Sequence, residues 1–133
     1  MQIHTQVRTD GPVPVTVIGI EGELDTTTFG DLEKKGEEVY KAGARRIVLD
    51  LTGVRHISSA GLRAIHSIYN LLRSNYPAES DEILRKKVAE KKFKSTLLKL
   101  VSPNESILQI LQTSGYNAFL EVHTDLNTAI QSF

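Results

Sequence analysis

The sequence contains no cysteine, which excludes disulfides and thiolate chemistry and agrees with a reducing compartment. It also has no excess of either charge, because 16 lysines and arginines balance 16 aspartates and glutamates. Balanced charge gives no long-range field that would recruit nucleic acid or anionic lipid, so a protein partner or a small ligand is expected.

Long apolar runs are absent as well. No stretch approaches the roughly 18 residues that span a bilayer, and residues 1–7 lack the basic and apolar parts of a secretory signal. A soluble cytoplasmic protein without membrane insertion is therefore expected. With 133 residues, of which 40% are hydrophobic, the chain suits one compact core, so we expect a single domain over 1–133.

The first half of the chain alternates between strand and helix periodicity. Residues 3–9 and 13–20 flank the turn Asp10-Gly11-Pro12, which predicts an antiparallel hairpin. Helical spacing follows over about 29–40, ends near Gly43, and returns over about 60–74. Between these helices, the apolar run 47–51 is typical of a strand covered on both faces.

The C-terminal third continues the alternation. After a strand over 96–101, Ser102 can cap a helix, with Pro103 at its first helical position and Glu105 completing a capping box. Gly115 would end this helix, residues 119–123 form a short strand, and Asp125 caps a last helix. The order ββαβαβαβα predicts an α/β fold, with a mixed, mostly parallel sheet, an N-terminal β-hairpin and helices packed on the sheet.

One charged segment, at about 75–95, interrupts this rhythm as an insertion. It is much longer than the usual 2 to 6 residues between a helix and a strand. Ser80 can cap a short helix whose first turn holds Asp81 and Glu82. The segment is either a solvated surface element or a second contact surface, since several apolar residues in it have no evident core to join. These are Ile83, Leu84, Val88 and Phe93.

The chain's most informative stretch joins the strand at 47–51 through a short loop to the helix at 60–74. It places Ser58 and Ser59 in the first turn of that helix, where a negative charge is favoured. The two hydroxyls are candidates for a regulatory switch, or for a pair that only caps the helix.

An enzymatic role for these serines is not supported. A nucleophile elbow needs glycine two residues before the serine, where Ile57 stands. His56 and His66 have no evident acid to orient them, and His4 and His123 show no metal-ligand spacing. Because the sequence also lacks a nucleotide-binding glycine loop, we expect no enzyme activity, cofactor or metal.

Several motifs together resemble the STAS domain of bacterial anti-sigma factor antagonists. They are Gly22-Glu-Leu-Asp25, Val48-Leu-Asp-Leu-Thr-Gly-Val54, Ser59-Ala-Gly-Leu62, and Ser102-Pro with Ile107, Leu111 and Gly115. Ser-Ala-Gly-Leu alone is weak evidence, but its place after an Asp-Leu-Thr strand and a Gly-Glu-Leu-Asp turn is fairly specific. The resemblance covers nearly the whole chain apart from the insertion and implies a STAS-like fold.

This resemblance implies a switch in partner choice. In such proteins a serine-kinase anti-sigma factor phosphorylates the serine near the helix start. The unphosphorylated antagonist binds that kinase and frees the sigma factor, and a PP2C-like phosphatase resets the system. Ser59 matches the phosphorylated serine, with Ser58 as a less favoured acceptor, and Asp50 matches a structural aspartate. The expected partner-binding residues are Asp25, Thr26, Thr27, Ser58, Gly61 and Leu62.

The sequence departs from the family pattern at Ser58, where the motif carries aspartate. The acceptor can survive with altered kinase recognition. Alternatively, the domain is a non-phosphorylated interaction or scaffold module, in a signalling assembly or beside a transporter. The oligomeric state stays open, because an exposed sheet edge or the insertion can pair with another copy.

Overall fold

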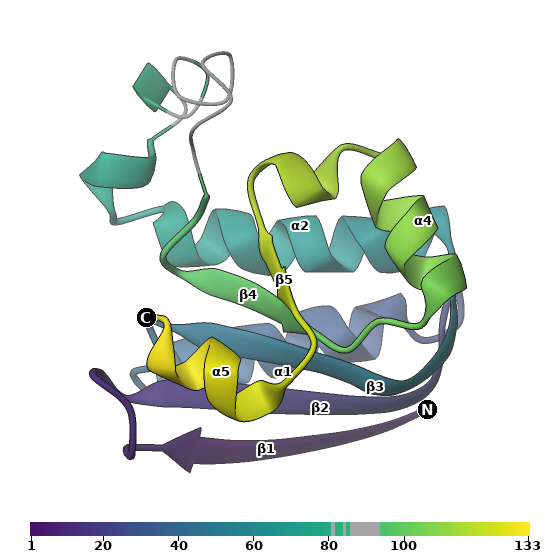
Figure 1. Ribbon diagram of the computed structural model, residues 1–133, viewed down its shortest axis with the longest axis horizontal. Coiled ribbons are helices and arrows are strands. Elements are labelled where there is room, and N and C mark those ends of the chain that lie inside the picture. Colours follow the sequence, from purple (N-terminus) through teal and green to yellow (C-terminus); the bar gives the residue numbers. More distant parts are fainter. Residues whose placement is uncertain (81, 84, 86–93) are drawn as a thin grey trace.

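The computed structural model describes residues 1–80, 82–83, 85 and 94–133, which form a sheet with helices on both faces (Figure 1). The strands are β1 (Gln2–Arg8), β2 (Val15–Leu24), β3 (Ile47–Ile57), β4 (Leu98–Val101) and β5 (Glu121–His123). The helices are α1 (Phe29–Lys41), α2 (Ser59–Arg73), α4 (Glu105–Thr113) and α5 (Leu126–Gln131), with short 3₁₀ turns η1 (Pro77–Glu79) and η2 (Tyr116–Ala118).

The strands are arranged in the sheet in the order β1-β2-β3-β4-β5. β1 is antiparallel to β2, and every other neighbouring pair is parallel. This confirms the predicted mixed, mostly parallel sheet with its N-terminal hairpin. The predicted order ββαβαβαβα is also correct for the described residues.

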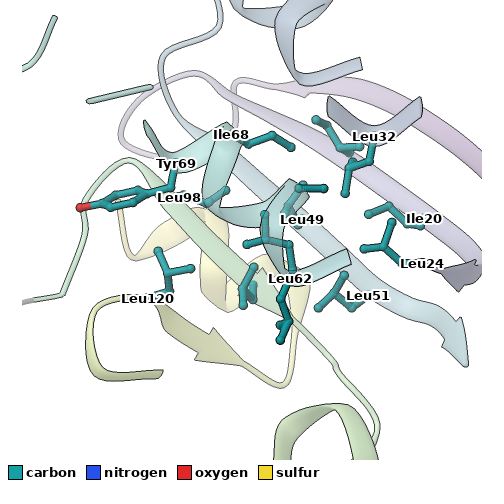
Figure 2. Packing of buried hydrophobic residues seen from close by; sticks show 14 of the residues in the cluster. Ile20, Leu24, Leu32, Leu49, Leu51, Leu62, Ile68, Tyr69, Leu98 and Leu120 are labelled. Atoms are coloured by element: carbon teal, nitrogen blue, oxygen red, sulfur yellow. The ribbon is translucent and has the colours of Figure 1, made fainter. Parts of the chain in front are cut away.

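Alternating residues of the central strands enter two separate cores. On one face, Ile18, Ile47 and Leu98 pack with α1, α2 and α4 in the main cluster, part of which Figure 2 shows. On the other face, Val17 and Val48 pack under α5. Because both faces are covered, even the short central strands are buried on both sides.

The central strand β3 is longer than the sequence predicted. Its first residues pair with both β2 and β4, whereas residues 53–57 continue beyond β4 and pair with β2. A strand therefore replaces the expected loop before Ser58. The expected Gly22–Asp25 turn is also partly strand, since β2 continues to Leu24, with a register shift at Gly22.

The predicted cap of α4 was wrong. Asn104, not Ser102, is the N-cap, and its Oδ1 accepts the N–H of Ile107 at 2.8 Å. Ser102 has φ of 53° and its hydroxyl donates to the carbonyl of Thr124 at 2.8 Å. Both side chains suit a cap, but Ser102 is held at the end of β4 by its contacts with the chain after β5.

Glu79 is almost fully buried, at 3% exposure, near the start of the predicted insertion. Its Oε1 accepts the hydroxyls of Tyr69 (3.0 Å) and Ser95 (2.7 Å), and its Oε2 accepts the N–H (3.1 Å) and hydroxyl (2.9 Å) of Thr96. We call these four residues the Glu79 clamp. Burial, followed by the charge of Glu79, raises the pKa of Tyr69. The clamp joins the two ends of the insertion to each other and to α2.

The insertion itself is only partly described. Ser80 Oγ accepts the N–H of Ile83 at 3.5 Å, which is a weak version of the predicted cap. Asp81, Leu84, Val88 and Phe93, which the sequence analysis also named, lie outside the described residues.

Lys99 is a second buried charge, at 2% exposure, on the α5 face of β4. Its Nζ lies 2.9 Å from Glu121 Oε2 and donates to the hydroxyl (2.8 Å) and carbonyl (3.1 Å) of Ser132. The ammonium also lies 4.5 Å from the ring centre of Phe133. Lys99 thus attaches the end of the C-terminal helix to the sheet.

Candidate functional site

The candidate site lies where β2 and β3 end side by side. Leu24 pairs with Ile57 in the parallel register, and the N–H of Ser58 donates to the Leu24 carbonyl at 2.9 Å. Asp25 and Ser58 immediately follow this last pair. The structure therefore brings the two predicted motifs, far apart in sequence, together at the C-terminal ends of β2 and β3 (Figure 1).

Ser58 and Ser59 differ in their roles at the start of α2. Ser58 is the N-cap, with extended backbone, and its hydroxyl accepts the N–H of Gly61 at 3.4 Å. Ser59 is the first helical residue, and its side chain is exposed. The first turn contains no acidic residue, so nothing there offsets the positive end of the helix dipole.

Asp25 lies in an ordered turn next to this helix. Its Oδ1 accepts the N–H (2.9 Å) and hydroxyl (2.7 Å) of Thr27, and these bonds lower the pKa of Asp25. Thr28 Oγ accepts the Asp25 N–H and donates to the Glu23 carbonyl, which fixes the turn. Thr26 and Thr27 are exposed beside it, so a carboxylate and two threonines lie on the accessible surface.

Gly61 and Leu62 occupy the inner side of the helix start. Leu62 is 8% exposed and belongs to the main core, and Gly61 is buried against the end of β2. A Cβ on Gly61 would lie 2.5 Å from the Leu24 carbonyl oxygen and 2.8 Å from the side chain of Ile57. Both residues set the position of the serines, and their contact with a partner stays a prediction.

Replacing Gly61 with alanine is expected to destabilise the protein by about 1 to 3 kcal/mol, because the new methyl group overlaps a backbone carbonyl. Urea unfolding followed by circular dichroism would measure the change. Gly30→Ala in α1 is the matched control: nothing lies within 4 Å of its Cβ position, so its stability should stay the same or rise. Equal stabilities of the two variants would contradict the close packing at Gly61.

Sequence reasoning missed the contribution of Asn104. Besides capping α4, its Nδ2 donates to the carbonyls of Val54 (3.4 Å) and Arg55 (3.3 Å). These bonds attach the start of α4 to the part of β3 that leads to Ser58. Asparagine after proline was a visible capping signal, but only the fold shows the contact with β3.

The other predicted residues have separate surroundings. Asp50 Oδ1 accepts the N–H and hydroxyl of Thr52, which agrees with its expected structural role. His66 contacts the rings of Tyr116 and Phe119 edge-on, and burial lowers its pKa. Within the described parts of the chain, no cluster of potential metal ligands occurs, and no helix is long and apolar enough to cross a membrane.

Comparison with known proteins gave one family and several similar structures. The family model of the STAS domain matches residues 4–76, which is more than half of the chain. A search of curated proteins gave no match.

Three solved structures illustrate the similarity in fold. A putative anti-sigma factor antagonist from Thermotoga maritima is 20% identical, with a TM-score of 0.71 over 96% of this chain and 90% of that one. An anti-sigma factor antagonist from Mycobacterium paratuberculosis is 22% identical, with a TM-score of 0.68 over 96% and 91%. The phosphorylated Bacillus cell fate determinant SpoIIAA is 16% identical, with a TM-score of 0.57 over 94% and 96%.

Proposed function

The chain belongs to the STAS-domain family, and we propose that it is an anti-sigma factor antagonist that phosphorylation of Ser59 switches off. The observation that carries this proposal is the exposed Ser59 at the start of α2, next to the turn of Asp25. Its partner would be a serine-kinase anti-sigma factor in the cytoplasm, and a PP2C-like phosphatase would reverse the modification.

The helix start favours Ser59 over Ser58 as the acceptor. Ser58 is half-buried and its hydroxyl caps the helix, whereas Ser59 is exposed. A phosphate on Ser59 adds about 1.5 to 2 negative charges next to a helix N-terminus. Exposed Arg63 follows four residues later, on the same side of the helix, and can balance part of that charge. The modification can therefore be accommodated without unfolding the domain.

The effect of the phosphate falls on the interface. If a carboxylate of the partner lies about 5 Å from the phosphate, each unit of like charge costs about 3 kcal/mol at an effective dielectric constant near 20. That energy corresponds to about a hundredfold loss of affinity. The unphosphorylated form would bind the kinase, and the phosphorylated form would release it.

This function can be tested with ATP and candidate serine-kinase anti-sigma factors from the same genome. Intact-mass spectrometry should show one added phosphate on the wild type and on Ser58→Ala, and none on Ser59→Ala. Ser59→Asp should weaken binding to the kinase, measured by calorimetry, with a smaller loss than phosphorylation because its charge is smaller. Unchanged binding by Ser59→Asp, together with no phosphate transfer by any kinase, would contradict the switch.

The alternative is a STAS interaction or scaffold module that is never phosphorylated. It is favoured by Ser58 in place of the family's aspartate and by the insertion, whose two ends the Glu79 clamp holds together. Replacing residues 81–93 with a short glycine-serine linker keeps the clamp intact. Loss of partner binding in this variant, with the same unfolding midpoint as the wild type, would support the scaffold function instead.

A further inference from the structure

We infer that the protein forms a homodimer in which the β1 strands of two copies pair antiparallel across a two-fold axis at Thr5. β1 is at one end of the sheet and runs along the outside of the fold (Figure 1). It pairs with β2 along its whole length, and no other described strand pairs with its outer edge. That edge presents unpaired backbone groups to another strand.

The two edge strands of the sheet, β1 and β5, differ in how well they can pair with a strand of another molecule. β5 has only three residues, and short edge strands discourage association. β1 has seven residues, and its sequence Gln-Ile-His-Thr-Gln-Val-Arg contains neither proline nor lysine, the residues that commonly block an edge. Val7 is 67% exposed on it. Apart from Arg8 at its end, the outer edge of β1 therefore lacks the usual protection.

Helix α1 leaves the second half of one face of β1, at Thr5 and Val7, uncovered. Ile3, Thr5 and Val7 share that face because side chains alternate along a strand, and Ile3 packs against the main core. Beside Thr5 and Val7 lies an open groove of about 640 Å³, whose opposite wall includes Val39 of α1. Pairing with a second β1 strand would place an apolar side chain of that second copy at the edge of this open groove.

The β1 sequence is complementary to itself in one register. With the axis at Thr5, Ile3 faces Val7 of the second copy, His4 faces Gln6, and Gln2 faces Arg8. Thr5 faces its own counterpart, and threonine pairs are favourable across strands. No two like charges oppose each other.

Neighbouring symmetric registers lose this complementarity. An axis at His4 places the two His4 rings against each other, and an axis at Gln6 places His4 against Arg8. Both also separate Ile3 from Val7. The pattern of apolar and polar side chains therefore favours the Thr5 register for pairing with a second copy.

The dimer would leave the candidate site free. Two five-stranded sheets joined through β1 form one continuous sheet in which the strands of the two copies run in opposite directions. The two Ser59 turns, which follow the ends of β3, then lie at opposite ends of the assembly. This inference does not depend on phosphorylation of Ser59.

Sedimentation of the full chain tests the dimer. Because pairing of one strand edge is a small interface, we expect a monomer–dimer equilibrium between about 10 µM and about 1 mM. Thr5→Lys places two like charges at the axis and should weaken dimerisation at least about tenfold. Gln109→Lys adds the same charge on the exposed side of α4 and should leave the equilibrium unchanged. A wild type that stays monomeric at the highest concentration, or equal dimerisation by Thr5→Lys, would overturn the proposal.

A cross-linking experiment provides a second measurement. Since the chain has no cysteine, Thr5→Cys introduces a single thiol at the axis, where opposed Cβ atoms come close enough for a disulfide. We expect oxidation to give a covalent dimer at least about tenfold faster than for Gln109→Cys. Equal rates for the two variants would also overturn the proposed pairing.

Discussion

Glu79→Ala is expected to lower the free energy of unfolding by about 3 to 5 kcal/mol. The substitution removes a buried carboxylate that accepts four hydrogen bonds. It leaves the hydroxyls of Tyr69 and Ser95 and the N–H of Thr96 without this acceptor, next to a new cavity. Urea denaturation at neutral pH would measure the loss.

Two other variants separate the clamp from a general effect of charge. Glu82→Ala removes an exposed glutamate from the same segment and should change stability by no more than about 0.5 kcal/mol. Glu79→Gln should fall between them, because its amide oxygen can still accept from Thr96 while its NH₂ faces two hydroxyls that can rotate. If Glu79→Ala is as stable as Glu82→Ala, the carboxylate does not hold the segment.

Lys99→Ala is expected to cost a similar amount, about 3 to 5 kcal/mol. It removes the ammonium that contacts Glu121 and Ser132, together with the buried alkyl stem. The loss should concentrate at the C-terminal helix, since Ser132 follows α5 directly. Hydrogen exchange of the α5 amides should therefore accelerate more than that of α2.

Lys99→Met is the matched variant, because it keeps most of the stem and removes only the charge. Its cost should be smaller, since Glu121 is 32% exposed at its side chain and keeps a contact with His123 at 3.1 Å. Replacing a buried pair by apolar volume is often tolerated, whereas truncation leaves both a cavity and unpaired groups. Equal losses for methionine and alanine would show that the charge, not the packing, holds α5.

The element order could be predicted from the sequence because its signals are local. Gly43 and Gly115 both have positive φ, at 111° and 82°, where the periodicity predicted helix ends. Asp125 caps α5 as expected, with its carboxylate accepting the N–H of Thr128 at 2.9 Å. Each of these features depends on a few neighbouring residues, so it is visible without the fold.

The interior charges could not be predicted in the same way, because burial depends on what covers each face. Lys99 lies between Leu98 and Leu100 and reads as the polar side of a strand, yet α5 covers that side. The strand at 47–51 was expected to be covered on both faces. The same expectation for the next strand would have predicted that Lys99 is buried. Glu79 gave no such signal, since its partners are 10, 16 and 17 residues away.

The candidate site could be predicted only in part, because its motifs are local but the exact start of α2 is not visible in the sequence. Sequence motifs identified both the serine turn and the Asp25 turn, and parallel pairing of Leu24 with Ile57 makes them neighbours. Which serine caps the helix depends on where α2 begins, and that boundary shifted by one residue from the expected 60. This shift makes Ser58 the cap and leaves Ser59 exposed.

The ordered turn at Asp25 has a consequence for binding kinetics. Its carboxylate and Thr28 are held by hydrogen bonds within the turn, and Ser58 fixes the adjoining helix start. The entropy cost of arranging this surface is met during folding, so a partner meets a preorganised face. The association rate constant should then be similar for related partners, and differences in affinity should appear in the dissociation rate constant.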